Sequence, residues 1–271
     1  MATRLFEEKE HASSYQKYRF SPAQEIQDMI FSYLHEKLNK PYELAVDVGC
    51  GTGLSTKILS PHFKKVLGID ISKAQIEEAK NAVKLPNTIF RVSPAEEVPV
   101  DDASVDLLTA CAAVHWFDIE KLLTEVDRIL KPGGCLAFYT YTLNMELHYK
   151  YRSEQLTKLF LEVKDFLTNY QNEKMHHVQT EYKEIFDCIP YTDKLRIVDI
   201  VTKTRISVGD IIGFCQTLSA FRIYHRLEPE NAKDYIKAIE KRFLDIMEVS
   251  SSETEVELWC KHVVLLASKP K

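Results

Sequence analysis

Residues 46–53 read VDVGCGTG, and they follow the short apolar segment YELAV at 42–46 without a break. A strand that runs into a glycine-rich turn lets the backbone approach a ligand closely, because glycine has no Cβ atom and adopts positive φ readily. The free N–H groups at the start of a following helix can face the same ligand. The stretch therefore predicts a strand, a tight turn and a ligand site where the strand ends.

Short apolar segments and amphipathic segments alternate on the C-terminal side of this turn. We expect strands at 43–48, 64–70, 88–92, 105–111 and 134–141, and helices at 21–38, 54–62, 72–84 and 118–130. Strands without a polar face are buried on both sides, which is typical of a parallel sheet covered by helices. The region 42–141 is therefore predicted to be a doubly wound α/β unit of the Rossmann type.

The pattern changes after this region. Residues 146–188 are charged, aromatic and helical in character, which indicates an insertion. Strand character returns at 194–207 and 256–269, with two helical segments between them. We predict one domain over residues 1–271, with a cofactor-binding core at 42–141 and a helical lid insertion at 146–188.

The charge and composition exclude some classes of partner. The formal net charge is −5 and the pI is about 6.0, and no long Lys/Arg run is present, so a nucleic acid partner is not expected. No apolar stretch approaches the roughly 20 residues that span a bilayer, and the first residues are charged, unlike a signal peptide. The expected protein is soluble and cytoplasmic, with no membrane partner.

The six cysteines are dispersed and form no CxxC pair. No histidine stands beside them at the spacing of a metal site. We therefore expect free, mainly buried thiols, and neither a disulfide framework nor a metal site.

Three glycines and one acid define the chemistry of the turn. The pattern Gly49-x-Gly51-x-Gly53 departs from a dinucleotide fingerprint, which has its third glycine where Leu54 stands. Asp47 would place a carboxylate at the mouth of the turn, where it repels a pyrophosphate and attracts an ammonium group. S-adenosylmethionine meets this requirement, since it carries an ammonium and a sulfonium and has no phosphate.

A second acid, Asp70, ends the next predicted strand about 20 residues later, where a carboxylate can accept both ribose hydroxyls. NAD and S-adenosylmethionine share this need, so Asp70 indicates a nucleoside cofactor without choosing between them. Asp47 and Asp70 could each be an ordinary strand-end residue. Taken in order and in a βαβ context, the glycines and the two acids favour a cofactor site.

Four stretches together resemble the successive motifs of class I S-adenosylmethionine-dependent methyltransferases. They are VDVGCGTG, GIDIS, SPAEEVPVDDASVDLL and RILKPGG. SSYQKYRFSP, AAVHWFD and TLSAF are similar to a small-molecule subgroup that includes trans-aconitate methyltransferase. The resemblance implies a seven-stranded, mainly parallel sheet with one antiparallel strand near the C-terminus, S-adenosylmethionine as cofactor and a small-molecule acceptor.

The resemblance also assigns roles to residues. The glycines and Asp47 would lie beside the methionine part of the cofactor, Asp70 would hold the ribose, and Ile71 would lie against the adenine. The loop SPAEEV would meet the adenine edge through Ala95 or Glu96. The cofactor-binding residues implied in this way are Asp47, Gly49, Gly51, Gly53, Asp70, Ile71, Ala95, Glu96 and Ala112.

The acceptor would approach the end of the strand at 105–111, where small residues leave room for the sulfonium. His115 and Trp116 follow directly and would face the acceptor, and Trp116 could exclude water. A carboxylate acceptor favours a cationic or hydroxyl-rich pocket, and an arginine can grip it with two N–H groups. The pocket residues expected on this basis are Tyr15, Tyr18, Arg19, His115, Trp116, Ser219 and Arg222.

Methyl transfer from a sulfonium is an in-line displacement, so positioning of the nucleophile supplies most of the catalysis. We assign no covalent or acid/base catalytic residue, because a carboxylate acceptor is already ionised. The expected function is methylation of a small molecule, such as a carboxylic acid. The alternatives are a catalytically silent member of the fold that binds the cofactor or a partner, and a methyltransferase with a macromolecular acceptor.

Overall fold

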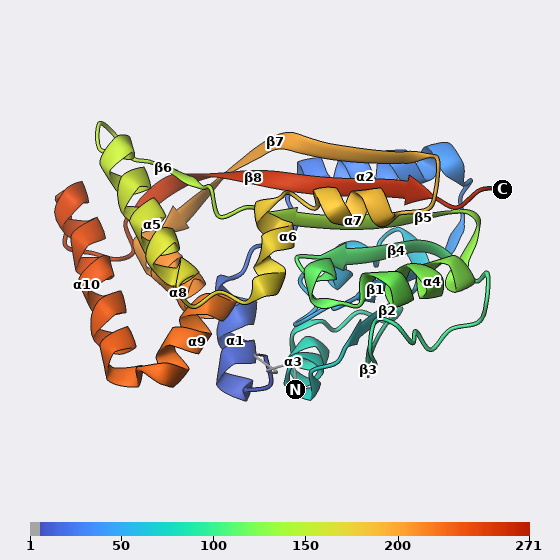
Figure 1. The fold of residues 1–271 in the computed structure, drawn as a ribbon, viewed down its shortest axis with the longest axis horizontal. Helices are drawn as coiled ribbons and strands as arrows, with labels where there is room; N and C mark the ends of the chain where they lie inside the picture. The colour runs from blue at the N-terminus through green and yellow to red at the C-terminus, as the bar shows by residue number, and fades with distance from the viewer. Residues whose placement is uncertain (1–5) are drawn as a thin grey trace.

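The computed structural model describes residues 6–271, and an eight-stranded sheet forms its centre (Figure 1). The order of the strands is β3-β2-β1-β4-β5-β8-β6, and β7 also pairs with β8. Their bounds are β1 (Tyr42–Val48), β2 (Phe63–Asp70), β3 (Thr88–Val92), β4 (Val105–Cys111), β5 (Leu130–Tyr141), β6 (Glu146–His148), β7 (Lys194–Ser207) and β8 (Glu255–Ser268). The four pairings that join β3, β2, β1, β4 and β5 are all parallel, as the apolar strands predicted.

Strand β8 is antiparallel to every strand that it pairs with. Its C-terminal half pairs with β5, its N-terminal half pairs with β6, and β7 follows it along nearly its whole length. The mainly parallel Rossmann-like sheet with a reversed strand near the C-terminus is therefore confirmed. The eighth strand is the short β6, which lies in a segment for which the sequence predicted only helix.

Helices cover both faces of the sheet. The α-helices are α1 (Lys9–Tyr18), α2 (Gln24–Lys37), α3 (Lys73–Ala82), α4 (Ile119–Ile129), α5 (Ser153–Thr168), α6 (His176–Gln179), α7 (Lys183–Cys188), α8 (Val208–Thr217), α9 (Ser219–Leu227) and α10 (Pro229–Met247). Short 3₁₀ turns occur at η1 (Thr56–Ile58), η2 (Val114–Trp116) and η3 (Glu173–Met175). None of the helices in residues 6–271 combines the length and the apolarity that crossing a lipid bilayer requires.

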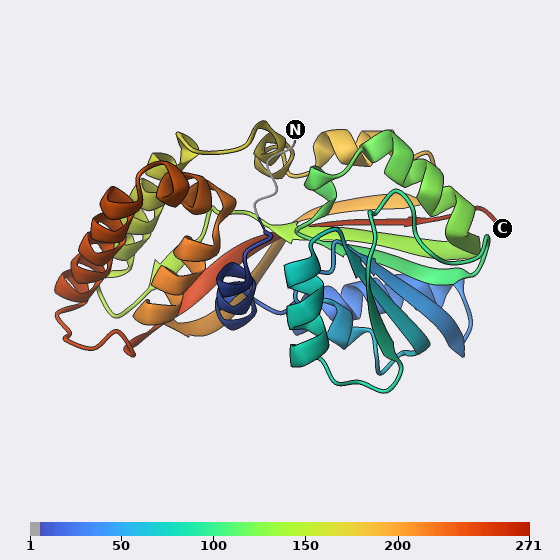
Figure 2. The ribbon, with the colours of Figure 1, turned by 90° about the horizontal axis from the view of Figure 1, so that it is seen from below.

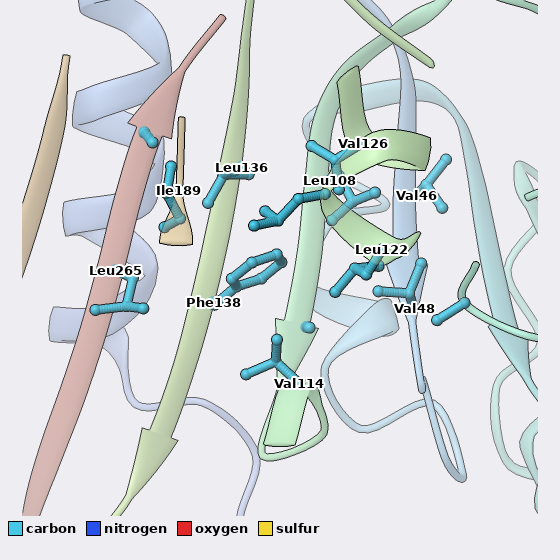
Figure 3. Close-up of a cluster of buried hydrophobic side chains, with 14 of the residues drawn as sticks. Val46, Val48, Leu108, Val114, Leu122, Val126, Leu136, Phe138, Ile189 and Leu265 are labelled. Atoms are coloured by element: carbon cyan, nitrogen blue, oxygen red, sulfur yellow. The ribbon is translucent and has the colours of Figure 1, made fainter. Parts of the chain in front are cut away.

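Neighbouring residues of a strand belong to different apolar clusters. Val46 and Leu108 pack with α4 and α7 on one face, and Phe138 of β5 lies in the middle of this cluster (Figure 3). Ala45 and Leu107, one position earlier, pack with α2 on the opposite face. This alternation explains the absence of a polar face, because each strand contributes apolar side chains to two cores.

A further apolar cluster lies at the other end of the molecule, in its helical half. Helices α5, α8, α9 and α10 gather there, away from the parallel strands, and the long strands β7 and β8 extend from one end to the other (Figure 2). Leu258 of β8 belongs to this cluster, whereas Leu265 of the same strand belongs to the sheet core. The helical half therefore includes α8–α10 as well as part of the segment 146–188.

Two of the predicted helix starts are confirmed by their caps. The Ser72 hydroxyl accepts a hydrogen bond from the Gln75 N–H at 3.3 Å, and the Asp118 carboxylate accepts one from the Lys121 N–H at 3.3 Å. The predicted helix start at Ser21 is wrong, because α2 begins only at Gln24 and has no side-chain cap. Instead, the side chain of Gln27 donates to the Pro22 carbonyl at 2.8 Å.

The expected helix at 54–62 is also wrong, since only the short turn η1 forms there. The hydroxyls of Ser55 and Thr56 bind Asp47 at the end of β1, and this keeps the segment folded tightly against the strand. At the start of the lid segment, β6 precedes α5, which begins only at Ser153. Pairing with β8 supplies hydrogen bonds to these residues that the sequence pattern alone does not show.

Candidate functional site

The glycine turn between β1 and η1 has the left-handed backbone that the sequence predicted. The φ angles of Gly49, Gly51 and Gly53 are +63°, +53° and +83°. A Cβ atom on Gly49 would lie 2.7 Å from both Ala113 and Phe117. At Gly51 the nearest atoms to such a Cβ are 3.6 and 3.9 Å away, so the turn leaves space above its middle glycine.

Asp47 lies beneath this turn rather than at its mouth. The side chain is fully buried, and its two oxygens accept hydrogen bonds from the hydroxyls of Ser55, Thr56 and Thr109 at 2.7–2.8 Å. Burial raises the pKa of this carboxyl, while the three hydroxyls act in the opposite direction. The expectation of an open carboxylate is therefore corrected, because the protein's own hydroxyls satisfy it.

Asp70 ends β2 next to the turn and connects it to α3. One carboxylate oxygen accepts the Gly51 N–H at 3.0 Å and the other accepts the Ser72 N–H at 2.8 Å. Burial raises the pKa of Asp70 to about 6, against the effect of these two hydrogen bonds. Each oxygen keeps a lone pair, so the carboxylate can still accept two ribose hydroxyls.

Polar and apolar groups beside the turn fit a nucleoside cofactor. The buried Thr52 hydroxyl and the Gln75 side-chain carbonyl have no hydrogen-bond partner among residues 6–271. The Gln75 oxygen is 3.6 Å from the Cβ position of Gly51, at the space above the turn. Ile71 and Val92, at the ends of β2 and β3, are 53% and 54% exposed and offer an apolar surface to an adenine ring.

The loop that was expected at the adenine edge is held by its own contacts. Ala95 is buried in the sheet core, and one Glu96 oxygen accepts the Asp118 N–H at 2.9 Å. The side chain of Ala95 therefore faces the protein interior. A role for this loop toward adenine rests on its backbone or on the second oxygen of Glu96.

A small cavity of about 60 Å³ lies next to the glycine turn and contains most of the predicted acceptor residues. Tyr15 connects the two places, because its ring lines the cavity and also lies 3.9 Å from the Cβ position of Gly51. Ala112, expected near the cofactor, lines the cavity too and has a φ of +49°. The predicted acceptor residues that line it are Tyr15, Arg19, His115, Trp116 and Ser219.

Arg19 is the cation of this cavity. Its Nε donates to the Thr217 hydroxyl at 2.7 Å, one terminal nitrogen donates to the Thr217 carbonyl at 3.0 Å, and the other donates to the Tyr141 hydroxyl. The guanidinium also lies 4.8 Å from the ring centre of Tyr15 and 5.0 Å from that of Phe214. Within residues 6–271, no carboxylate forms an ion pair with Arg19, and two of its five N–H groups have no protein acceptor.

His115 is buried beside Arg19, and its Nδ1 lies 2.8 Å from the Tyr182 hydroxyl. Burial lowers the pKa of His115 to about 3, and the nearby cationic side chains act in the same direction. The imidazole is therefore neutral at pH 7. Arg19 remains the charged group that lines the cavity.

Two of the predicted acceptor residues do not line the cavity. The Tyr18 ring packs against the backbone of α8, only 2.4 Å from the Cβ position of Gly213. Arg222 pairs with Glu8, which precedes α1. Both residues hold α1 against the helical half of the molecule, so their roles toward an acceptor remain predictions.

Several lining residues were missed by the sequence analysis, because they come from distant segments. Phe6 contacts the Trp116 ring edge-on at 5.9 Å, and Tyr141 stands at the end of β5. Tyr141 could have been found from its place at the carboxyl end of a central strand, where sites of such sheets occur. Phe6, Met175 and Val178 lie outside the core motifs, and no local signal marks them.

The described residues contain no group of three or more His, Cys, Asp and Glu side chains that could hold a metal ion. The open glycine turn, the carboxylate at the end of β2 and the adjoining cavity instead fit a nucleoside-containing donor beside an anionic acceptor.

This chain is similar to known proteins in sequence and in fold. The methyltransferase domain family matches residues 46–138. A Dictyostelium discoideum protein named as a methyltransferase is 27% identical over 245 residues, which make up 90% of this chain and 88% of that protein. The trans-aconitate 2-methyltransferase of Deinococcus radiodurans is 38% identical over 122 residues, which make up 44% of this chain and 43% of that enzyme.

The fold is also found in a solved structure. A protein of Anaeromyxobacter dehalogenans, described as a type II methyltransferase, is 23% identical and has a TM-score of 0.72, with 90% of this chain and 97% of that chain covered. The family match spans the strands and the turn that form the cofactor site. The chain contains a methyltransferase domain and is an S-adenosylmethionine-dependent methyltransferase, with S-adenosylmethionine as its cofactor.

Proposed function

We propose that this protein transfers the methyl group of S-adenosylmethionine to a carboxylate oxygen of a small organic acid. One observation carries the proposal, namely the partly buried guanidinium of Arg19, which lines the cavity beside the glycine turn and has no carboxylate partner among residues 6–271. A charge that is withdrawn from water without an ionic partner is costly unless other groups compensate for it. The two aromatic rings compensate in part, and an acceptor carboxylate would supply the missing negative charge.

The residues around Arg19 suit it for positioning. Thr217 and Tyr141 take three of its N–H groups and fix the plane of the guanidinium. The remaining two can hold a carboxylate, and a bidentate pair also orients it. The name of the Deinococcus radiodurans relative, trans-aconitate 2-methyltransferase, supports an acidic acceptor.

The cofactor site would hold the donor next to this carboxylate. Asp70 would accept the ribose hydroxyls, the glycine turn would face the methionine part, and Ile71 would cover the adenine. The cofactor supplies an electrophilic methyl group. Tyr15 and Trp116 would keep water out, and Arg19 would hold the nucleophilic oxygen in line with the methyl carbon.

The test is incubation with methyl-labelled S-adenosylmethionine and a panel of mono-, di- and tricarboxylic acids, followed by mass spectrometry. We expect a labelled monoester. In the Arg19→Lys variant, which keeps the charge but loses the fork, kcat/KM for that acid should fall about a hundredfold. Calorimetry should show that the affinity for S-adenosylmethionine changes less than threefold.

The Arg205→Gln variant is the matched control, since Arg205 is highly exposed on β7 and makes only a 3.8 Å contact with Glu255. It should leave the rate unchanged. Phosphoethanolamine belongs in the panel, because a phosphoethanolamine N-methyltransferase of Haemonchus contortus shares the fold at a TM-score of 0.52. A labelled amine with no labelled ester would contradict a carboxylate acceptor, as would an unchanged rate in Arg19→Lys.

A further inference from the structure

The cavity beside Arg19 is too small to be the whole acceptor site. Its volume of about 60 Å³ is well below the roughly 300 Å³ at which ligand pockets begin. A narrow space of about 20 Å³ adjoins it, and Leu143, Met175, Leu218 and Ser219 line both. An acceptor of ordinary size must therefore extend beyond the cavity.

A larger cleft of about 300 Å³ follows the narrow space. Leu143 and Met175 line all three spaces, and Lys164 and Gln171 line the narrow space and the cleft. The cleft lies between the link from β5 to β6 and the segment from α5 to α6. The three spaces thus form a row that begins at Arg19 and ends in the helical insertion.

The cleft contains a buried polar group without a partner. Thr142 is only 5% exposed, lines the cleft, and its hydroxyl has no hydrogen-bond partner among residues 6–271. Leaving a buried hydroxyl unsatisfied costs about 1–3 kcal/mol. A ligand group that hydrogen-bonds to Thr142 would recover this free energy.

The charges in the cleft are already paired. The Lys164 ammonium donates to the Asn144 side-chain oxygen at 3.0 Å and lies 3.5 Å from Asp165. Glu181 pairs with Arg196 and Lys261. Each charged side chain that lines the cleft therefore already has a partner of opposite charge among residues 6–271.

Neutral hydrogen-bonding groups remain available in the cleft. The Gln179 amide donates to the Gln171 side-chain oxygen at 2.9 Å, which leaves the amide of Gln171 and the oxygen of Gln179 unused in that pair. Together with the Thr142 hydroxyl, these groups offer both donors and acceptors. This chemistry matches amides and hydroxyls better than an alkyl chain or a second carboxylate.

We propose that the cleft binds the tail of the acceptor, and that this tail is an uncharged chain carrying amide or hydroxyl groups. The acceptor is then an elongated acid with its carboxylate at Arg19 and its neutral tail beside Thr142. The identity of the carboxylate end rests on the proposed function, whereas the neutral tail rests on the cleft alone.

Binding to the full chain with S-adenosylhomocysteine, measured by calorimetry, tests the proposal without turnover. The probes are propanoate and three acids of similar length, N-(hydroxypropyl)succinamate, nonanoate and azelate, which carry an amide and hydroxyl tail, an alkyl tail and a second carboxylate. We expect the succinamate to bind at least tenfold more tightly than the other three. Equal affinities, or tighter binding of nonanoate or azelate, would overturn the proposal.

The Thr142→Val variant keeps the shape of the side chain and removes the hydroxyl. The variant should bind the succinamate about fivefold or more weakly than the wild type does, and its affinity for propanoate should be unchanged. Thr124→Val is the control, because Thr124 is an exposed residue of α4 whose hydroxyl donates to the Glu120 carbonyl. Equal weakening of both acids in Thr142→Val would indicate a structural effect and would contradict the proposal.

A probe without a carboxylate separates this proposal from the proposed function. N-(hydroxypropyl)acetamide carries the neutral tail alone. If it binds and Thr142→Val weakens it while no acid binds, the cleft is confirmed and the carboxylate acceptor is wrong. If neither the amide nor the succinamate binds more tightly than propanoate, the cleft does not hold the tail.

Discussion

At the scale of single residues, the two acids of the cofactor site show how surroundings assign different roles to the same side chain. Asp47 is satisfied by three hydroxyls from the protein and stabilises the end of β1. Asp70 accepts two backbone N–H groups and keeps free lone pairs beside the space above Gly51. Asp70 is therefore the acid we expect to contact the cofactor.

The pKa of Asp70 makes this contact measurable. Burial raises the pKa of Asp70 to about 6, so ionisation of this carboxyl opposes folding. The contribution of the protonated Asp70 to the free energy of unfolding is therefore lost as the pH rises from about 4 to 6. Accepting ribose hydroxyls requires the ionised form. The affinity for S-adenosylmethionine should thus weaken up to about tenfold between pH 7.5 and pH 5.

Calorimetric titrations at several pH values check this prediction. In Asp70→Asn the affinity should be lower at pH 7.5 and nearly independent of pH. Asp101→Asn, which changes an exposed acid on the loop before β4, should keep the pH dependence of the wild type. A wild-type affinity that stays constant from pH 5 to pH 7.5 would exclude Asp70 as the titrating contact.

The glycines make a second prediction at this scale. In Gly51→Ala the new methyl group has no close contact, but the alanine must adopt a positive φ. We expect this variant to lower the free energy of unfolding by about 1–2 kcal/mol. Ala at Gly49 also clashes with Ala113 and Phe117, and should cost about 2–5 kcal/mol. Gly51→Ala should nevertheless lose cofactor affinity at least tenfold, because its methyl group enters the space above the turn.

Denaturant unfolding and cofactor calorimetry separate the two effects. Gly209→Ala is the control, since Gly209 is helical and its nearest atoms are 3.5 Å from the Cβ position. Gly209→Ala should change the free energy of unfolding by no more than about 1 kcal/mol. Its affinity for the cofactor should equal that of the wild type. Unchanged affinity in Gly51→Ala would place the cofactor elsewhere.

At the scale of elements, α4 holds the loop between β3 and β4. All five N–H groups of Arg128 are used, by both oxygens of Glu125, by Asp102 and by the carbonyls of Val98 and Val100. Glu125 also accepts the Val98 N–H at 2.6 Å. This loop contains no helix, so Arg128 replaces the rigidity that a helix would supply.

Removal of this arginine should loosen the loop that carries Ala95 and Glu96. We expect Arg128→Ala to lower the free energy of unfolding by about 1–2 kcal/mol and to lower the binding affinity for S-adenosylmethionine several-fold. Arg242→Ala, which breaks a single exposed ion pair with Glu162, should change both by much less. Loss of stability with full cofactor affinity would show that the loop does not contact the cofactor.

At the scale of the whole molecule, β8 contributes to the apolar cluster of the helical half and to the clusters on both faces of the sheet. Its last residue in the helical-half cluster is Cys260, and its first in the sheet core is Val263. Strand β7 follows it along this path, with a register shift between Ile197 and Ile200. Because the two halves share this continuous strand pair, neither half keeps a complete sheet without the other.

The two halves should therefore unfold together. The chain has only two tryptophans, Trp116 beside the acceptor cavity and Trp259 stacked on His148 in the helical half. Each of the variants Trp116→Phe and Trp259→Phe keeps one tryptophan, which reports on the half of the molecule that contains it. In both variants, the unfolding midpoint from tryptophan fluorescence should equal the midpoint from far-ultraviolet circular dichroism. Separate midpoints for the two variants would show that the halves unfold independently.

Local patterns determined the central part of this protein. The strand and the glycine turn at 46–53, the acid at Asp70 and the apolar strands up to β5 are each encoded by a few neighbouring residues, and so the fold and the cofactor could be predicted. Helix ends and the strand β6 were missed where a distant partner supplies the hydrogen bonds. Tertiary context overrides local preference at such places.

The acceptor site depends on contacts that form only when the chain folds. Arg19 and Thr217 are 198 residues apart, and nothing near Arg19 in the sequence shows that two rings flank it or that it has no carboxylate partner within residues 6–271. The cleft with Thr142 likewise forms between segments that meet only after folding. Local sequence patterns therefore predicted the donor, because its site is built from neighbouring residues, while the acceptor depends on side chains that long-range packing brings together.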